Sequence, residues 1–259
     1  MLCKPAAGNG GHKMSRYSWF TVYDLSKIKE FYNRIPEIWA SDDVWHTYSH
    51  YELDHYIHQH MNLFEGTRVL NAGSGGNDYG ISCQEMYHVD IAEEKIKNCK
   101  NYIVSSIEEL SFPDESFDNI ICVGSVLNYC DAFQAISELS RVLKKSGKII
   151  LEFESSWGYE YLNTKEYKAP VTVITLEYMH EQHIQWLFSP EYIYKILKQY
   201  NLKILEQTPF HILDGLLSKI LSEELSVKLT KIDHIIKNWP IFRKHGNNII
   251  LLLEKSFVP

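Results

Sequence analysis

Short apolar runs alternate with amphipathic stretches between residues 67 and 155, which is the pattern of strands separated by helices. The run 118–123 follows an acid and is mostly apolar, as expected for a strand buried on both faces of a parallel sheet. Such alternation predicts an α/β fold with helices on both sides of the sheet. The predicted strands here are 67–72, 86–90, 118–123 and 147–153, and the predicted helices are 92–100 and 132–143.

The residues that precede this region have a helical and strongly aromatic pattern, from 16 to 65. Asp24 or Ser26 can cap a first helix there, and Pro36 disturbs it because proline lacks the amide hydrogen that a helix needs. A second helix is predicted over 47–63, where tyrosines and histidines recur at helical spacing.

The residues that follow Ser155 change character twice. From 156 to 188 the pattern is irregular. At Ser189 a helix is predicted to begin, because a capping serine is followed by proline and an acid, and it runs to about Tyr200. Beyond it the sequence predicts a strand at 202–208, a helical stretch at 211–238 and a last strand at 248–254.

Composition narrows the class of protein. The 259 residues include 26 Lys plus Arg and 33 Asp plus Glu, so the net charge of −7 removes the broad positive surface that nucleic-acid binding usually needs. No apolar run is long enough for a membrane span. Residues 1–15 have no apolar core, so we interpret them as a disordered leader or a cloning remnant. The 5 cysteines form no C-x-x-C pair, which predicts a reducing, cytoplasmic location.

The main chemical signal is a glycine cluster at the end of the strand 67–72. Gly73, Gly75 and Gly76 let the backbone turn sharply and approach a ligand without a Cβ in the way. Asp90 ends the next strand, where a carboxylate can accept both hydroxyl hydrogens of a ribose. Ligands bind at the carboxyl ends of strands in open α/β sheets, so the pair predicts nucleoside binding.

The glycine loop does not have the pattern of a phosphate-binding loop. Asp78 stands at the third glycine position of the dinucleotide fingerprint, and a carboxylate there repels a diphosphate. A Walker-type G-K-[ST] is absent as well. The loop therefore fits a ligand without phosphates, and a ligand with an ammonium group is compatible.

Residues 67–155 resemble the class I S-adenosylmethionine-dependent methyltransferases, especially those that act on small molecules. The similar motifs are the first glycine motif at 69–77, the ribose acid at 89–91, the adenine-side loop at 105–118, the fourth-strand motif at 122–129, the helix and turn at 138–148, and the helix start at 188–191. Asn71 and Ser106 stand where the family has acids. The segment between Gly75 and Asp90 is short, so the first core helix is expected to be abbreviated or absent.

The resemblance implies a Rossmann-like seven-stranded sheet in a single domain, residues 16–259, with S-adenosylmethionine as cofactor. The parts expected are a helical lid at 16–65, a cofactor-binding core at 66–155, an acceptor-side insertion after the fifth strand at 156–188, and a C-terminal part at 189–259 with a helical insertion after the sixth strand. The cofactor-binding residues that it implies are Asn71, Gly73, Ser74, Gly75, Asn77, Asp90, Ile91, Ser106, Ile107, Glu108, Val123, Gly124 and Ser125.

Methyl transfer to a small or medium organic acceptor is the function that follows from this resemblance. A base is needed only where the acceptor is protonated at neutral pH, and Glu154 and His183 are the candidate catalytic residues, with His180 and Glu181 as further candidates. The histidines around His46 invite a metal interpretation, but several of them point in different directions on a helix, so no metal is predicted.

Two other functions stay open at this point. The first is a methyltransferase that acts on tRNA or protein, against which stand the acidic balance and the lack of an Asn/Asp-Pro-Pro-aromatic motif. The second is a non-catalytic subunit that binds S-adenosylmethionine and supports a partner. The sequence determines neither the accepting atom nor the oligomeric state.

Overall fold

A computed structural model of the chain describes residues 25–39, 43–179, 181–217, 221, 225, 230–237 and 239–256. The predicted leader at 1–15, the first part of the predicted lid and the candidate base His180 lie outside the described residues.

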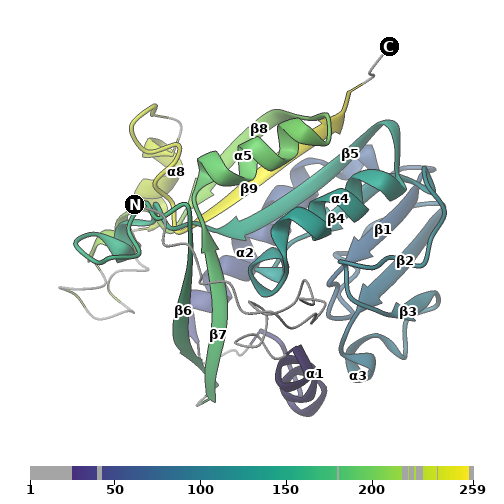
Figure 1. Cartoon of the computed structure of the whole chain (residues 1–259), viewed down its shortest axis with the longest axis horizontal. Coiled ribbons are helices and arrows are strands. Elements are labelled where there is room, and N and C mark those ends of the chain that lie inside the picture. The colour runs from purple at the N-terminus through teal and green to yellow at the C-terminus, as the bar shows by residue number, and fades with distance from the viewer. Residues whose placement is uncertain are drawn as a thin grey trace, which may run out of the picture.

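The described strands form a seven-stranded sheet in the order β3-β2-β1-β4-β5-β9-β8 (Figure 1). The first five strands pair in parallel, and β9 runs antiparallel to both of its neighbours. This confirms the predicted Rossmann-like sheet. The strands are β1 (Arg68–Ala72), β2 (Glu85–Asp90), β3 (Tyr102–Val104), β4 (Phe117–Cys122), β5 (Leu143–Glu154), β8 (Leu202–Phe210) and β9 (Asn248–Lys255).

Helices α4 (Ala132–Val142) and α5 (Pro190–Gln199) cover one face of the sheet, and both begin where the sequence predicts. Asp131 caps α4 by accepting hydrogen bonds from two backbone amides, and Ser189 caps α5 with Pro190 in its first turn. The other described helices are α1 (Leu25–Arg34), α2 (Val44–Gln59), η2 (Met61–Leu63), α3 (Glu93–Ile96), η3 (Val126–Tyr129), η4 (Tyr159–Tyr161), α6 (Leu213–Leu217) and α8 (Thr230–Ile236).

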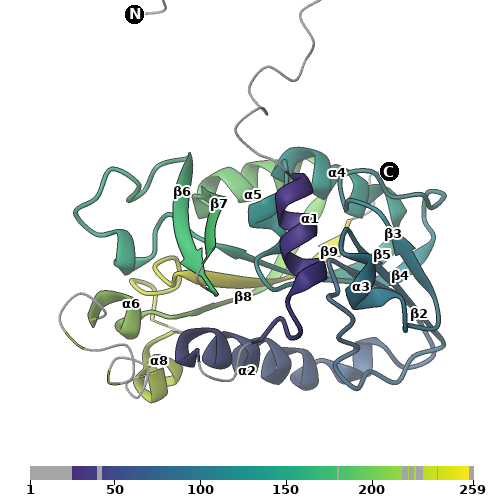
Figure 2. The same cartoon turned by 90° about the horizontal axis from the view of Figure 1, so that it is seen from below.

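Helix α2 covers the opposite face of the sheet. The segment between β1 and β2 forms no helix, as its length predicts, so this face of β1 and β4 needs another cover. Leu53 and Ile57 of α2 supply it by packing on Val69, Ile121 and Ile150. The buried face of α2 therefore belongs to the core, and the lid expected at 16–65 stays a prediction. Figure 2 shows α1 lying between α3 and the hairpin of β6 (Val171–Tyr178) and β7 (Glu181–Phe188).

The insertion after β5 is more ordered than the sequence predicts. Instead of an irregular segment, β6 (Val171–Tyr178) and β7 (Glu181–Phe188) form an antiparallel hairpin outside the main sheet. The pattern was missed because His183 and Gln185 occupy buried positions of β7, where an alternating strand normally has apolar residues. The helix predicted at 92–100 is shorter, since only Glu93–Ile96 are helical.

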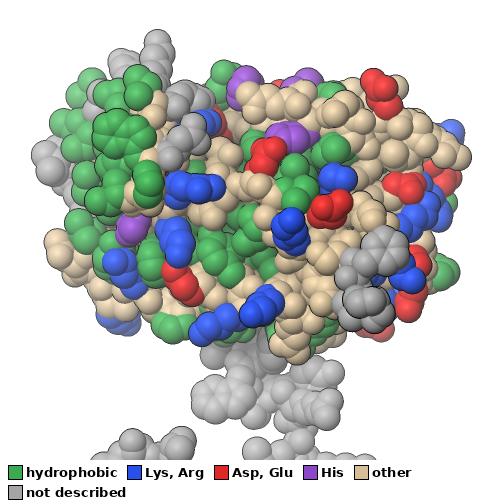
Figure 3. Space-filling model, turned by 90° about the horizontal axis from the view of Figure 1, so that it is seen from above, with side chains coloured by type: hydrophobic (Ala, Val, Ile, Leu, Met, Phe, Trp, Pro, Cys, Tyr) green, Lys and Arg blue, Asp and Glu red, His purple; other side chains and the backbone are tan. Residues whose placement is uncertain are grey.

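The surface at one end of the molecule is unusually apolar. Figure 3 shows apolar side chains gathered at the end where α8 lies in Figure 1, and the exposed ones there include Ile235, Trp239 and Ile241. Over the rest of this view lysine, arginine, aspartate and glutamate side chains are interspersed. Of the described helices, none is long and apolar enough to cross a bilayer.

If α2 is core rather than lid, truncating its buried face must destabilise the whole domain. Ile57 is 0% exposed, so Ile57→Ala should lower the free energy of unfolding by about 2–5 kcal/mol, through lost burial and the cavity left behind. Tyr51 lies on the same helix and is 55% exposed, so Tyr51→Ala should cost less than about 1 kcal/mol. Denaturant unfolding of both variants measures this, and equal effects would contradict the core role of α2.

Candidate functional site

The loop after β1 and the end of β2 are joined by one carboxylate. Gly73 and Gly75 adopt φ of +70° and +54°, in the left-handed region that glycine enters without strain. Asp90 Oδ2 accepts a hydrogen bond from the Gly75 amide at 2.9 Å, and its Oδ1 accepts from the Ala92 amide at 2.8 Å. Burial raises the pKa of the Asp90 carboxyl, and these amides act against that shift. The carboxylate keeps lone pairs for a ligand.

A first cavity opens beside this carboxylate. Seven of the predicted cofactor residues line it, namely Gly73, Gly75, Asp90, Ile91, Ser106, Ile107 and Gly124. The sequence prediction missed the others, which come mostly from α1, its following segment and η3: Leu25, Ile28, Tyr32, Ile38, Lys95, Ser105, Val126, Tyr129 and Cys130. Those from α1 carry no motif, so only the fold could reveal them.

The first cavity fits a nucleoside with no phosphate. Ile91 and Ile107 offer apolar surface to a planar base, and the Asp90 carboxylate can accept the hydroxyl groups of a ribose. A Cβ at Gly73 would lie 2.4 Å from the Val126 side chain, so only glycine leaves this wall open. Among the described lining residues Lys95 is the one lysine or arginine, and it donates to the carbonyl oxygens of Ile35 and Pro36 and so holds the segment after α1.

The remaining predicted cofactor residues lie around this cavity rather than on it. Ser74, Asn77 and Val123 line a third cavity on the other side of the glycine loop, and Ser125 lines a second cavity described below. Asn71, which replaces the family's acid, donates from Nδ2 to the Asn77 carbonyl oxygen at 2.6 Å and so holds the loop. Glu108 accepts from the Asp131 amide and from the Ser106 hydroxyl.

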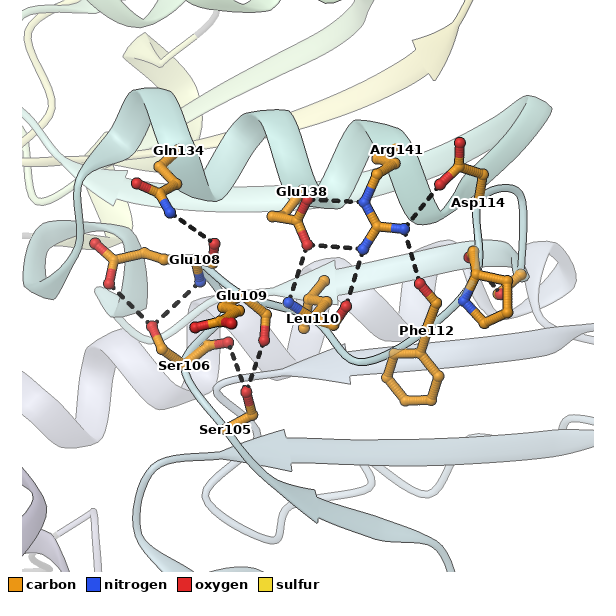
Figure 4. Close-up of polar contacts among 12 residues, drawn as sticks. Ser105, Ser106, Glu108, Glu109, Leu110, Phe112, Asp114, Gln134, Glu138 and Arg141 are labelled. Atoms are coloured by element: carbon orange, nitrogen blue, oxygen red, sulfur yellow. Dashed lines mark hydrogen bonds and ion pairs between the residues drawn. The ribbon is translucent and has the colours of Figure 1, made fainter.

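Arg141 of α4 fixes the segment that carries Ser106 and Ile107 (Figure 4). Its guanidinium donates to both carboxylate oxygens of Glu138, at 2.8 and 2.7 Å, and to the carbonyl oxygens of Leu110 and Phe112. Glu138 in turn accepts from the Leu110 amide at 2.9 Å. The ion pair therefore supplies hydrogen bonds that this extended segment lacks within itself, and it positions one wall of the first cavity.

A second cavity adjoins the first, and the two share Tyr32, Ile38, Gly124 and Tyr129. Aromatic rings make up much of its wall, while Glu152 and Glu154 project from the carboxyl end of β5. Its other lining residues are Trp39, Trp45, His46, Ser49, Leu53, Ser125, Leu176, Tyr178, Gln185, Phe210 and Asn248.

Glu152 holds the loop after β4. Its Oε2 accepts from the amides of Gly124 and Ser125, at 2.9 and 2.7 Å, and its Oε1 accepts from Asn248 Nδ2 at 2.7 Å. Ser125 can then adopt its left-handed φ of +57° at the start of η3. Burial raises the pKa of Glu152 to about 7, although its three donors favour the charged form.

The two candidate catalytic residues lie in different surroundings. Glu154 lines the second cavity and accepts from the Ser125 hydroxyl at 2.8 Å and from Gln185 Nε2 at 2.5 Å, while burial raises its pKa. His183 is not among the residues that line the described cavities. Its ring packs 4.2 Å from that of Phe31, so it joins α1 to the hairpin, and burial lowers its pKa.

A buried hydrogen-bond chain links α2 to the insertion after β8. Ser49, which lines the second cavity, lies 2.9 Å from His211 Nε2, and His211 Nδ1 contacts the Asp214 carboxylate. Trp45 stacks flat on the His211 ring at 3.7 Å. These contacts position the Trp45 and Ser49 wall of the second cavity. No local pattern predicts them, because Ser49 and His211 are 162 positions apart.

The histidines of α2 and of its C-cap take part in separate local contacts. His46 Nδ1 contacts the Asp43 carboxylate at 2.5 Å, His50 stacks on Trp39, and His60 contacts the Tyr56 carbonyl oxygen. No group of three or more metal-ligating side chains occurs within the described part of the chain.

Comparison with known proteins identifies the class of this domain. Residues 70–151 match the family model described as "Methyltransferase domain". The ubiquinone/menaquinone biosynthesis C-methyltransferase UbiE of Rickettsia massiliae is 32% identical over 123 residues, which are 39% of this chain and 49% of that protein. The chain thus spans about half the length of the curated relatives it matches.

Solved structures share the fold at low sequence identity. The 1,6-didemethyltoxoflavin-N1-methyltransferase of Burkholderia thailandensis, with S-adenosylhomocysteine bound, has a TM-score of 0.57 at 12% identity and covers 99% of this chain and 94% of its own. The geranyl diphosphate C-methyltransferase of Streptomyces coelicolor has a TM-score of 0.58 at 10% identity, covering 90% and 98%. Residues 70–151 thus form a methyltransferase domain whose cofactor is S-adenosylmethionine, as the motifs predict.

Removing the Arg141 guanidinium should lower both the stability of the fold and the affinity of the first cavity for its ligand. Arg141→Met strands the Glu138 carboxylate and two carbonyl groups, so we expect a loss of about 1–3 kcal/mol of stability and weaker S-adenosylhomocysteine binding. Lys144→Met, which breaks a surface ion pair with Asp118, should cost less than about 1 kcal/mol and leave binding unchanged. Denaturant unfolding and calorimetry measure both, and unchanged binding by Arg141→Met would contradict the positioning role.

Glu152 should make stability depend on pH. Because its folded pKa of about 7 lies above the ordinary 4.5, the folded state binds a proton more readily than the unfolded one between these values. Its contribution therefore favours the fold at low pH and is lost as the pH rises toward 7. Glu152→Gln should flatten the decline in unfolding free energy between about pH 5 and about pH 8. An unchanged slope would mean that Glu152 does not titrate as its burial implies.

Proposed function

We propose that this protein transfers a methyl group from S-adenosylmethionine, held in the first cavity, to a small organic acceptor in the second. The observation that carries this proposal is the junction of the two cavities at Tyr32, Ile38, Gly124 and Tyr129. If the nucleoside of S-adenosylmethionine lies at Asp90, its methyl group extends toward that junction. There it would meet an acceptor bound in the second cavity.

The residues of the first cavity would each have a limited task. The Asp90 carboxylate would accept the ribose hydroxyls, and Ile91, Ser106 and Ile107 would enclose the base. Gly73 and Gly75 would bring backbone close to the amino-acid end of the cofactor, with Ser74 and Asn77 on the far side of their loop. Asn71 and Ser106 stand where the family has acids. Asn71 donates a hydrogen bond to the Asn77 carbonyl oxygen and so holds the glycine loop.

Methyl transfer asks mainly for alignment and exclusion of water. S-adenosylmethionine supplies a sulfonium that already carries a reactive methyl group. The protein has to hold the acceptor atom in line with it, and positioning of this kind lowers a barrier by roughly 7–11 kcal/mol. Here α1, the segment to Trp39 and the β6–β7 hairpin would close the site, with His183 packed between α1 and the hairpin as a positioning residue.

A small acceptor is favoured over tRNA or protein by the shape of the second cavity. Its lining comes from α2, η3, β5, the hairpin and the last residue of β8, so side chains surround it on several sides. A protein side chain or an RNA base would have to enter this space from a larger body. A non-catalytic partner subunit remains the other alternative, and turnover of the cofactor by the purified protein with a small acceptor distinguishes the two.

The Asp90 carboxylate gives the sharpest test of cofactor binding. Asp90→Asn keeps the shape of the side chain but replaces one charged acceptor, so S-adenosylhomocysteine should bind at least about tenfold more weakly, which is roughly 1.4 kcal/mol. Asp78→Asn is the matched control, because Asp78 is an exposed acid of the same loop that lines none of the three cavities. Calorimetry with both variants and with NAD measures this. Tight NAD binding by the unaltered protein would overturn the assignment.

A further inference from the structure

The charged residues that line the second cavity are acids. Glu152 and Glu154 line it, and none of its described lining residues is lysine or arginine. Histidine is represented by His46, whose Nδ1 is held by the Asp43 carboxylate at 2.5 Å. The remaining wall is rich in aromatic rings: Tyr32, Trp39, Trp45, Tyr129, Tyr178 and Phe210. Acids combined with aromatic faces are the surroundings that proteins use for organic cations.

The two carboxylates differ in what they can still bind. Glu152 is 1% exposed and is used by three donors, two of them backbone amides of the β4 loop. Glu154 has one donor on each oxygen, the Ser125 hydroxyl and the Gln185 amide. A carboxylate offers about four lone-pair sites, so Glu154 retains acceptor capacity. It is therefore the acid available to a ligand, and Glu152 adds negative potential behind it.

We propose that the acceptor is an amine, bound with its cationic nitrogen at Glu154 and its apolar part against the rings of Trp39, Trp45 and Tyr178. This inference rests on the proposed function, because it assigns the acceptor side of the same site. It also gives Glu154 two tasks, which are to select a nitrogen that carries hydrogens and to take up the proton that must leave.

Anionic acceptors fit the second cavity poorly. A diphosphate such as the one in the Streptomyces structure, or a carboxylate, would enter beside two carboxylates with no lysine or arginine from the described lining to balance it. Placing like charges together in a site with little water is unfavourable. A neutral alcohol would meet no such repulsion, but it would also gain no charge-assisted hydrogen bond at Glu154.

The proton and electron balance of the step is simple. A protonated amine first gives one N–H proton to the Glu154 carboxylate, which exposes the nitrogen lone pair. That lone pair forms the new bond to the methyl carbon while the carbon–sulfur bond breaks, and the sulfur keeps the electrons of that bond. The product is a methylated ammonium, with the first proton left on Glu154 and then released to water. The raised pKa of Glu154 suits a group that holds a proton for part of the cycle.

Three isosteric probes test the inference directly. The full chain, saturated with S-adenosylhomocysteine, is titrated with 2-phenylethylamine, 2-phenylethanol and phenylacetate. The amine should bind at least about tenfold more tightly than the alcohol, and phenylacetate should bind most weakly. Equal binding of all three, or absence of amine binding, would overturn the inference. Failure of S-adenosylhomocysteine itself to bind would instead overturn the proposed function, so the two failures are distinguishable.

Variants then assign the preference to Glu154. Glu154→Gln should abolish the preference for the amine over the alcohol while S-adenosylhomocysteine affinity changes by less than about threefold. Glu154→Asp, which keeps the charge, should retain the preference at lower affinity. Glu177→Gln removes an exposed acid of the same hairpin that does not line the cavity, and it should change neither quantity. A preference that survives Glu154→Gln would place amine recognition elsewhere.

Discussion

The site depends on backbone amides that no strand can satisfy. Each loop at the carboxyl end of a parallel strand leaves the ladder, so its amides need other acceptors or water. In this protein two carboxylates provide them: Asp90 for Gly75 after β1, and the buried Glu152 for Gly124 and Ser125 after β4. Both cavities open between these loops. The acids that hold the backbone in place therefore also set the sign of the charge in the site.

A second constraint comes from the short segment between β1 and β2. Because this segment forms no helix, one face of the sheet would be bare, and α2 from the N-terminal region packs there instead. Residues 35–39, which follow α1, lie near the loops after β1 and β4, because Ile38 approaches Gly75 and Trp39 approaches Gly124. Ile38 of that segment lies so close to Gly75 that a Cβ on the glycine would be 2.1 Å from its Cδ1. Core packing and access to the cofactor site are thus coupled through residues 35–39.

The sequence was most informative where a residue type has a narrow physical meaning. Glycines at the end of an apolar strand, an acid at the end of the next one, and a Ser-Pro-Glu helix start each occur in the structure as predicted. Prediction failed where burial contradicts polarity. His183 and Gln185 occupy buried positions of β7, so the alternation of apolar and polar residues that is typical of a strand is absent there.

The sequence predicts only those parts of the candidate site that lie in local motifs. Residues of the glycine and acid motifs could be placed from the sequence, whereas Tyr32, Ile38 and Tyr129 reach both cavities only because α1 and η3 meet above the sheet. Long-range partners such as Ser49 and His211 have no local pattern at all. Local chemistry thus predicts what one loop can bind, and the tertiary fold decides which loops face one another.

Carboxylates line both cavities, and this charge suits methyl transfer. Methyl transfer moves a positive charge from sulfur to the acceptor without creating a new one, so an environment that is negative on both sides of the junction stabilises the charge before and after the step. Asp90 lies on the nucleoside side, and Glu152 with Glu154 lies on the other. An acceptor that became neutral or began as an anion would make the second group of acids unfavourable. Their burial, which raises the pKa of both glutamates, is a cost that a cationic acceptor offsets.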